Sequence, residues 1–404
     1  MYDAIVVGAR CAGAPTAMLL ARRGYRVLLA DRSEFPSDTH STHWIGYDGL
    51  ARLHRWGLLD RVAASGCPPT RRRVIERSGI RIAGTIPPRD GLPGGYAPRR
   101  KVLDSMLVEA ATDAGAEFRS RFAVQELLWD GGKVVGVVGK RSGGPSITER
   151  ARLIVGADGR NSLVARAVNA PVYDILRPQT CCYYTYWADT EIDGLYSWSS
   201  PKARRYQIAI PTNDGLVCTL IGWPHAEFAA IRADIEREFF AALDLADGIA
   251  QRVHCGRLVE RFYGTADLPN YFRRPYGPGW ALVGDAGHPK DPMHARGIRD
   301  AFRDVELLVE AVDAGLSGRR SFPEAMTEYE QARNVPALSM YQKLRRDLRF
   351  PPLPGVEVRL LRAVAEDQGL ADLYVGMRTG TVTRMEFEAV APAPIKQLLD
   401  EVAG

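Results

Sequence analysis

The first thirty residues alternate apolar and polar segments in an order that predicts a strand, a helix and a second strand. Residues 4–7 form a short apolar run typical of a buried strand, residues 14–23 fit a helix, and residues 26–30 form a second apolar run before Asp31. A turn that contains two glycines joins the first run to the helix. This order predicts a βαβ unit with parallel strands and a right-handed crossover.

Downstream, the pattern predicts a hairpin, a separate antiparallel sheet and a second strand–turn–helix. Two apolar runs, at 123–129 and 133–138, are expected to form a hairpin, and strands at 206–210 and 216–222 are expected on either side of a turn. Single strands are expected at 151–155 and 280–283. Helices are expected at 101–114, from Pro224 through Phe239, at 297–314, and from Pro323 onward with interruptions at Pro336 and at 350–355.

The predicted middle sheet is rich in aromatic side chains. They are Tyr183, Tyr184, Tyr186, Trp187, Tyr196, Trp198, Tyr206 and Trp223. We expect most of them to form core, with one or two available to line a pocket.

Composition narrows the class of protein. The 404 residues are 46% hydrophobic and 25% charged, which is typical of a folded globular chain and not of a disordered one. No apolar run reaches the 18 residues that a membrane span needs, and residues 4–7 are too short for a secretion signal, so we expect a cytoplasmic protein. Six cysteines without C-x-x-C spacing indicate neither zinc nor a disulfide framework. The net charge of +5 is dispersed in short arginine pairs, which does not indicate nucleic-acid binding.

The first turn carries candidate chemistry. Residues 8–13 match G-x-G-x-x-G at the first and third glycines, but Arg10 replaces the second glycine. The helix N-terminus after such a turn can bind a diphosphate, and Asp31, 23 residues after Gly8, is placed to accept hydrogen bonds from a ribose. An ordinary βαβ turn without a ligand is the alternative.

Two later motifs join this turn in a pattern that resembles a known family. Residues 153–162 read Leu-Ile-Val-Gly-Ala-Asp-Gly-Arg-Asn-Ser, and residues 284–288 read Gly-Asp-Ala-Gly-His and continue to Asp300-Ala301. With the first turn, over roughly residues 1–330, they resemble the flavoprotein monooxygenases built like p-hydroxybenzoate hydroxylase and the related geranylgeranyl-reductase-like flavoproteins. FAD is long, so three separated sites are what one protein needs to hold it.

The resemblance implies an α/β fold, in which a Rossmann-like FAD-binding domain carries an inserted antiparallel-sheet substrate domain and a helical C-terminal segment. The implied FAD-binding domain comprises 1–70, 98–170 and 275–330, the substrate domain 71–97 and 171–274, and the helical segment 331–404.

The family's motifs suggest which residues bind the cofactor. They are Gly8, Arg10, Cys11, Ala12, Gly13, Asp31, Arg32, Arg100, Asp158, Gly159, Gly284, Asp285, Pro292, Gly297 and Ile298. Asp285 can only accept hydrogen bonds when ionised, so it would orient ribityl hydroxyls. The helix that starts near Gly297 would direct its positive end at the flavin. The alternatives are that Asp158-Gly159 is only a turn and that Arg100 is a surface residue.

His43 and His294 are the candidate catalytic residues, since histidine can exchange a proton near neutral pH. Either one is alternatively a hydrogen-bonding spacer, and His288 is expected to be structural.

Arg10 and the segment 287–291 depart from the pattern of aromatic hydroxylases. The halogenase branch has a Trp-x-Trp-x-Ile-Pro element and a lysine well after the first motif. Neither is seen here, since residues 70–80 hold arginines and no lysine.

The resemblance implies an FAD-dependent monooxygenase. It would use NAD(P)H and dioxygen to hydroxylate a small aromatic or other organic molecule, of the secondary-metabolite kind, through a flavin hydroperoxide. One alternative is an FAD-dependent reductase of carbon–carbon double bonds, like the geranylgeranyl reductases, and another is a flavin-binding subunit without turnover. The sequence does not indicate the substrate's identity, the preference between NADH and NADPH, or the oligomeric state.

Overall fold

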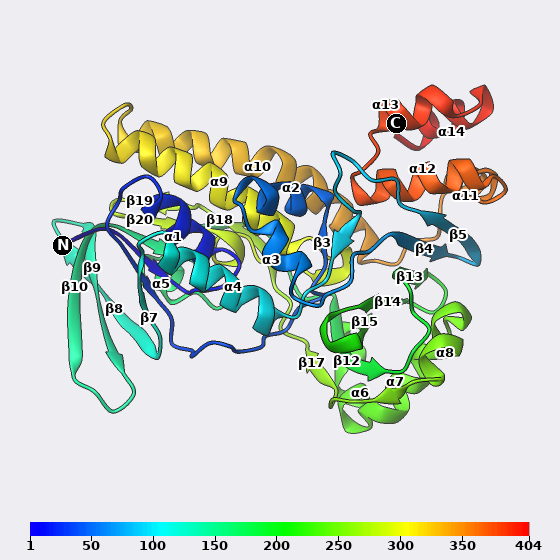
Figure 1. Cartoon of the computed structure of the whole chain (residues 1–404), viewed down its shortest axis with the longest axis horizontal. Helices are drawn as coiled ribbons and strands as arrows, with labels where there is room; N and C mark the ends of the chain where they lie inside the picture. The colour runs from blue at the N-terminus through cyan, green and yellow to red at the C-terminus, as the bar shows by residue number, and fades with distance from the viewer. Residues whose placement is uncertain (404) are drawn as a thin grey trace. The chain divides into compact units, whose positions relative to one another are not determined.

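The computed structural model describes residues 1–403 and divides into two compact units (Figure 1). The first unit consists of Met1–Ser41, Arg99–Arg177 and Pro269–Lys343. The second consists of Thr42–Pro98, Pro178–Leu268 and the segment from Leu344 onward. Each unit is therefore assembled from three separate stretches of the chain.

A largely parallel sheet organises the first unit. Its order is β19 (Tyr276–Gly277), β20 (Trp280–Leu282), β10 (Ser146–Gly156), β1 (Tyr2–Val7), β2 (Val27–Ala30) and β7 (Glu117–Arg119). All neighbours are parallel except β19, which pairs antiparallel with β20. The central strands are apolar on both faces because both faces are covered.

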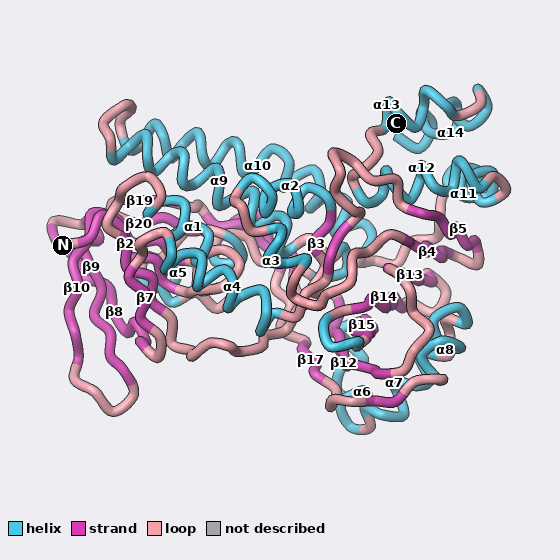
Figure 2. Tube along the Cα trace, in the orientation of Figure 1, coloured by secondary structure: helices cyan, strands magenta, loops and turns pink. Residues whose placement is uncertain are grey.

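One face of this sheet packs against a hairpin and a short helix. β8 (Phe122–Asp130) and β9 (Lys133–Arg141) continue antiparallel from β10 as the long ribbon drawn in magenta in Figure 2. Leu127, Val134 and Val137 of this ribbon join α5 (Leu163–Ala167) and the sheet in one core cluster.

The remaining helices of the first unit position the turns at the sheet edge. α1 (Gly13–Ala21) follows β1 and contacts both α4 (Arg100–Asp113) and α9 (Gly297–Leu316). The turns η3 (Gly284–Ala286) and η4 (Pro292–His294) lead from β20 into α9. β11 (Val172–Leu176) pairs with β18 (Asn270–Arg273), and α10 (Phe322–Asp347) ends just beyond the unit's boundary.

The second unit is built on a mainly antiparallel sheet. Its order is β16 (Arg257–Leu258), β12 (Thr180–Ala188), β15 (Val217–Pro224), β14 (Arg205–Pro211), β13 (Leu195–Ser200), β4 (Arg72–Arg77) and β5 (Ile80–Thr85), and β17 (Tyr263–Thr265) also pairs with β12. β3 (Ile45–Gly46) and β6 (Gly95–Tyr96) form a separate pair.

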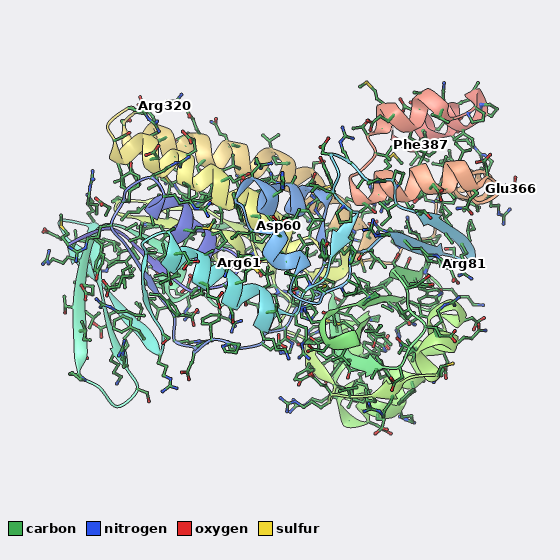
Figure 3. The ribbon with its side chains drawn as sticks, viewed as in Figure 1. Asp60, Arg61, Arg81, Arg320, Glu366 and Phe387 are labelled. Atoms are coloured by element: carbon green, nitrogen blue, oxygen red, sulfur yellow. The ribbon has the colours of Figure 1, made fainter. Side chains whose placement is uncertain are left out.

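Helices cover this second sheet in two groups. The group around the aromatic core comprises α6 (Phe228–Ala233), α7 (Ile235–Leu243) and α8 (Asp247–His254). The C-terminal group on β4 and β5 comprises α11 (Gly355–Ala365), α12 (Gln368–Thr379), α13 (Arg384–Val390) and α14 (Ala393–Ala403), and α2 (Tyr47–Arg55) and α3 (Leu59–Ala63) follow β3. Phe387, labelled in Figure 3, is fully buried and meets Tyr374 edge to face.

The predicted fold class is confirmed, but three local expectations differ from the structure. α10 runs through Pro336 without a break, because a face rich in buried residues such as Tyr329 and Tyr341 outweighs the one hydrogen bond that proline removes. The helix expected after Pro224 is divided at Asp234, whose side chain caps α7. Residues 42–70 belong to the second unit by contacts, whereas the predicted cofactor domain included them; the functional roles of the domains remain predictions.

None of the helices within residues 1–403 is both long and apolar enough to cross a membrane.

Replacing Gly13 by alanine is expected to destabilise the first unit. A Cβ atom on Gly13 would lie 1.7 Å from the carbonyl oxygen of Gly8, so the turn must open. The expected loss is about 1–3 kcal/mol, measured as a lower thermal midpoint. Gly297→Ala is the matched control, because a Cβ there meets nothing within 4 Å. Equal midpoints for the two variants would contradict the packing of this turn.

Candidate functional site

Three turns meet at the carboxyl edge of the parallel sheet in the first unit. A Cβ on Gly8 would lie 2.6 Å from the carbonyl oxygen of Ala157, and one on Gly284 would lie 2.9 Å from the Cβ of Ala12. Backbone hydrogen bonds join the same strands, because Ala157 N–H donates to Val7 and Val283 N–H donates to Gly156. The three motifs, far apart in sequence, therefore form one site, at the sheet edge where α/β proteins bind ligands.

Asp31 holds the first turn in place. Its Oδ2 accepts a hydrogen bond of 2.7 Å from the backbone N–H of Ala9, and its Oδ1 accepts one of 2.7 Å from Ser33. Each carboxylate oxygen can accept more than one bond, so a ribose can still be bound there. The neighbouring Arg32 is exposed.

The side chain of Arg10 points away from the first turn and contacts Asp104 and Ser37. Its Nη1 donates to Asp104 Oδ2 at 2.7 Å and to the Ser37 carbonyl at 3.2 Å. Its Nη2 donates to Ser37 Oγ at 2.8 Å, and the guanidinium lies 5.4 Å from the ring centre of Phe35. The arginine that replaces the second glycine is thus anchored to α4 and to the segment after β2.

Arg100 is buried at the start of α4 and shares Asp104 with Arg10. Its Nε donates to Asp104 Oδ1 at 3.0 Å, and the Cys11 thiol lies 3.3 Å from the same oxygen. Burial alone would lower the pKa of Arg100, but Asp104 and Cys11 outweigh it and raise the pKa. Burial raises the pKa of Cys11, so it remains a neutral thiol.

Only one of the two carboxylate oxygens of Asp158 accepts hydrogen bonds from the residues described. Oδ2 accepts from the N–H groups of Leu163 and Val164, at 2.7 and 3.2 Å, at the start of α5. Oδ1 is enclosed and has no hydrogen-bond partner among residues 1–403. Burial raises the pKa of Asp158. Gly159 follows with φ +75°, a conformation that favours glycine.

Asp285 presents an exposed carboxylate at the third turn. It is reached by solvent, and within residues 1–403 no hydrogen bond to its side chain is found. Burial among neighbouring atoms raises its pKa, while Lys290, Arg160 and Arg100 act in the opposite direction. An acceptor with adjacent cations suits hydroxyl groups next to a diphosphate, so the residues present fit FAD.

The segment after η3 leads to the N-terminus of α9. Pro292 and His294 lie in η4, and His294 is only half-buried. Ala295 has φ +50°, Gly297 has open space around it, and Ile298 is buried. The backbone at Gly297 is therefore accessible to a ligand.

Four basic side chains surround Asp300 in the first turns of α9. Lys290 Nζ lies 3.3 Å from Oδ2, while nitrogens of Arg296, Arg303 and Arg299 lie 3.6, 3.6 and 3.9 Å from Oδ1. Burial alone would raise the pKa of Asp300, but these cations lower it to about 2. Asp300 therefore lies among four positive charges, one of which, Arg303, also donates to Asp304 Oδ1 at 2.7 Å.

His288 has a structural environment. It stacks on Phe272 with 3.7 Å between ring centres, and its Nδ1 lies 3.0 Å from the carbonyl oxygen of Tyr271. Burial lowers its pKa well below the usual value, so the ring is neutral.

His43 lies in the second unit and pairs with a tyrosine of β12. It is fully buried, with φ +61°, and its Nε2 is 2.6 Å from the hydroxyl oxygen of Tyr186. Tyr184 meets the imidazole edge to face, and Tyr263 stacks on Tyr184 with 5.3 Å between centres. The predicted catalytic histidines thus occupy different units.

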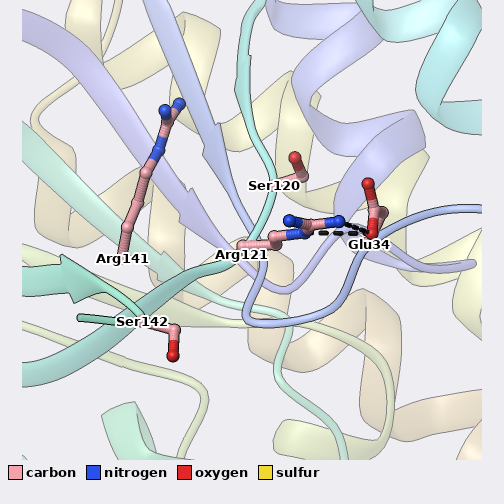
Figure 4. A pocket seen from close by; sticks show the side chains of 5 residues that line it. All are labelled: Glu34, Ser120, Arg121, Arg141 and Ser142. Atoms are coloured by element: carbon pink, nitrogen blue, oxygen red, sulfur yellow. Dashed lines mark hydrogen bonds and ion pairs between the residues drawn. The ribbon is translucent and has the colours of Figure 1, made fainter. Parts of the chain in front are cut away.

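A surface hollow of about 340 Å³ lies on the first unit (Figure 4). It is lined by Glu34, Ser120, Arg121, Arg141 and Ser142. Glu34 and Arg121 form an ion pair, and the N–H groups of Arg121 and Phe122 bond to Ser33 and Asp31. The hollow therefore adjoins the strand end that carries Asp31, and none of its lining residues was predicted.

Sequence reasoning missed Asp104, Tyr186 and the cations around Asp300. Asp104 stands four residues after Arg100 on a predicted helix, a spacing that allows an ion pair and could have identified it. Lys290 stood in the segment that departs from the family pattern. Tyr186 gave no local signal, because its partner is 143 residues away.

Asp300→Asn is expected to remove a pH-dependent contribution to the free energy of unfolding. The folded pKa, about 2, is below the ordinary 3.8, so ionised Asp300 contributes about 2 kcal/mol above pH 4, and this is lost as the pH falls toward 2. The difference in thermal midpoint between wild type and variant should be largest at pH 7 and shrink by about half at pH 3. A difference that is constant from pH 7 to pH 3 would contradict this electrostatic role.

Comparison with known proteins identifies the family. Residues 1–233 match the model described as "FAD binding domain". The chain is 28% identical over 352 residues to digeranylgeranylglycerophospholipid reductase of Methanocella arvoryzae, covering 81% of this chain and 82% of that protein. It is 28% identical over 357 residues to 6-methylpretetramide 4-monooxygenase of Streptomyces rimosus, covering 83% and 80%.

A solved structure has the same fold. The myxobacterial chondrochloren halogenase, an FAD-dependent halogenase, superposes with a TM-score of 0.79 at 21% identity and covers 97% of this chain and 98% of that one. With three converging turns that fit the cofactor and a family model that matches more than half of its residues, the chain belongs to the FAD binding domain family of flavin-dependent oxidoreductases.

Proposed function

We propose that the protein is an FAD-dependent monooxygenase that takes electrons from NAD(P)H and oxidises a small aromatic or other organic molecule with dioxygen. The observation that carries this proposal is the buried His43–Tyr186 pair, a polar group enclosed by aromatic rings in a chain of this family. The similarity to a monooxygenase over 83% of the chain supports it.

The first unit supplies the cofactor site of this proposal. The N-terminus of α1 and the guanidinium of Arg100 would bind the diphosphate, while Asp31 and Asp285 would accept hydrogen bonds from ribose and ribityl hydroxyls. The N-terminus of α9, with the cations around Asp300, would favour negative charge on a bound ring. When bound, FAD supplies the redox and oxygen chemistry.

The second unit supplies the groups proposed to act on the substrate. The 2.6 Å contact between His43 Nε2 and Tyr186 Oη can hold a proton or pass it along. The stacked rings of Tyr184 and Tyr263 would keep water from this pair and would favour a flat or apolar molecule beside it. His294, half-buried in η4, remains a second candidate for proton exchange.

A reductase of carbon–carbon double bonds is the second candidate function. The 28% identity to digeranylgeranylglycerophospholipid reductase, over 81% of the chain, specifically favours it. Both functions need FAD, but they differ in the need for dioxygen.

Dioxygen consumption distinguishes the two functions. We expect the purified protein to be yellow or to bind added FAD, and a panel of phenols, polyketide-like aromatics, amines and isoprenoids to include one that stimulates NAD(P)H oxidation. For a monooxygenase, substrate-dependent oxidation should consume one dioxygen for each product and stop under argon. Product formation that continues under argon would establish the reductase instead. FAD binding without any NAD(P)H oxidation across the panel would favour a subunit without turnover.

Tyr186→Phe tests the histidine–tyrosine pair. The substitution removes the hydroxyl beside His43, so we expect kcat to fall roughly tenfold to a hundredfold with the substrate found above, and the pH profile to change. FAD affinity should stay unchanged. Tyr183→Phe is the matched control, because Tyr183 is buried on the same strand and no hydrogen bond of its hydroxyl is found within residues 1–403. Equal kcat values and pH profiles in the two variants would rule out a role in proton transfer.

A further inference from the structure

We propose that Asp104 is a positioning residue of the cofactor site: it holds Arg10 away from the diphosphate and directs Arg100 toward it. This inference rests on the proposed binding of FAD at the three turns. It explains how the chain tolerates an arginine at a position where the dinucleotide fingerprint has a glycine.

The first step concerns Arg10. The second glycine of the fingerprint lets the backbone approach a diphosphate, and a long side chain at that position would obstruct the approach. Both terminal nitrogens of Arg10 are occupied away from the turn, Nη1 by Asp104 and Nη2 by the Ser37 hydroxyl. The shortest of these bonds, 2.7 Å, is the ion pair with Asp104. Asp104 therefore acts as the anchor that keeps the path open.

The second step concerns Arg100. Asp104 Oδ1 accepts from Nε of Arg100 at 3.0 Å. A guanidinium is planar and rigid, so fixing Nε also fixes the direction of Nη1 and Nη2. No hydrogen bond of these two terminal nitrogens is found within residues 1–403, and Asp285 of the third turn is close enough to act on the charge of Arg100. The two nitrogens are therefore available to a ligand bound near the third turn.

The third step concerns charge. Asp104 is fully buried and its single negative charge faces two arginines, while the neighbouring thiol of Cys11 is neutral. Arg10, Arg100 and Asp104 together carry one excess positive charge, and the carboxylate of Asp285 acts on it from the third turn. A diphosphate bound beside Arg100 would compensate this charge further, which is favourable where the arginine is buried. The cluster is thus built for an anionic ligand.

FAD affinity in four proteins tests the inference. They are the wild type, Arg10→Gly, Asp104→Asn and the double variant, titrated with FAD by flavin fluorescence at low and high salt. We expect Arg10→Gly to bind within about threefold of wild type, since glycine restores the usual fingerprint. Asp104→Asn should weaken binding at least tenfold, and removing Arg10 from that variant should recover part of the loss. Wild-type affinity should fall with salt, and Arg100→Gln should flatten that dependence.

Two comparisons would overturn the inference. The inference is wrong if Asp104→Asn binds FAD as tightly as wild type. It is also wrong if the double variant binds FAD no more tightly than Asp104→Asn. If Asp104→Asn does not fold, Arg10→Gly is compared with the double variant, which lacks both partners of the ion pair. The double variant should still bind FAD more weakly than Arg10→Gly, because Arg100 has lost its direction, and equal affinity of these two variants would refute the role of Asp104.

A further variant separates positioning from general stability. Glu149→Gln removes a half-buried carboxylate that pairs with Arg119 at 2.5 Å in the same unit, and within residues 1–403 the side chain of Arg119 bonds only to Glu149, Glu117 and Tyr2, none of which is assigned to the cofactor site. It should lower the thermal midpoint without changing FAD affinity. Should the wild type itself fail to bind FAD, the proposed cofactor site would fail; normal binding by wild type with unchanged affinity in the variants would refute only the role of Asp104.

Discussion

The close approach of three backbone turns is the constraint on which the rest of the structure depends. The turns after β1, β10 and β20 come so near one another that side chains at Gly8 or Gly284 would collide with Ala157 or Ala12. This contact requires the parallel register of the three strands and the glycines at their ends. It creates a single edge where a long dinucleotide can contact segments that are remote in sequence.

Electrostatics at this edge follows from the same packing. Carboxylates and arginines that are enclosed together must compensate one another, because isolated buried charges are costly. Asp104 compensates part of the charge of Arg10 and Arg100, and Asp300 shares its charge among four cations. The edge as a whole therefore suits anionic groups, which agrees with the family to which the chain belongs.

The second unit presents a different chemical environment. Aromatic rings surround His43 and Tyr186, and the backbone of His43 has a positive φ, a conformation that non-glycine residues seldom adopt. Strain of this kind persists where the surrounding structure fixes it, and it is frequent at functional sites. This pair is the observation on which the proposed oxygenase activity rests, whereas the cofactor edge suits either of the two proposed functions.

The sequence by itself determined the strands that end at the three turns, the turns and the family, since short apolar runs, glycines at strand ends and a nearby acid are local patterns with local physical causes. The cofactor-site residues that it indicates remain predictions until a ligand is measured. Only the tertiary structure decided where the side chain of Arg10 points, that Asp104 contacts Arg10 and Cys11 of the first turn, and that Tyr186 contacts His43. These contacts join residues 94 and 143 positions apart, and such pairs depend on how elements pack, which no local pattern contains. For the same reason α10 continues through Pro336: its buried face supplies stabilisation that the sequence around the proline does not reveal.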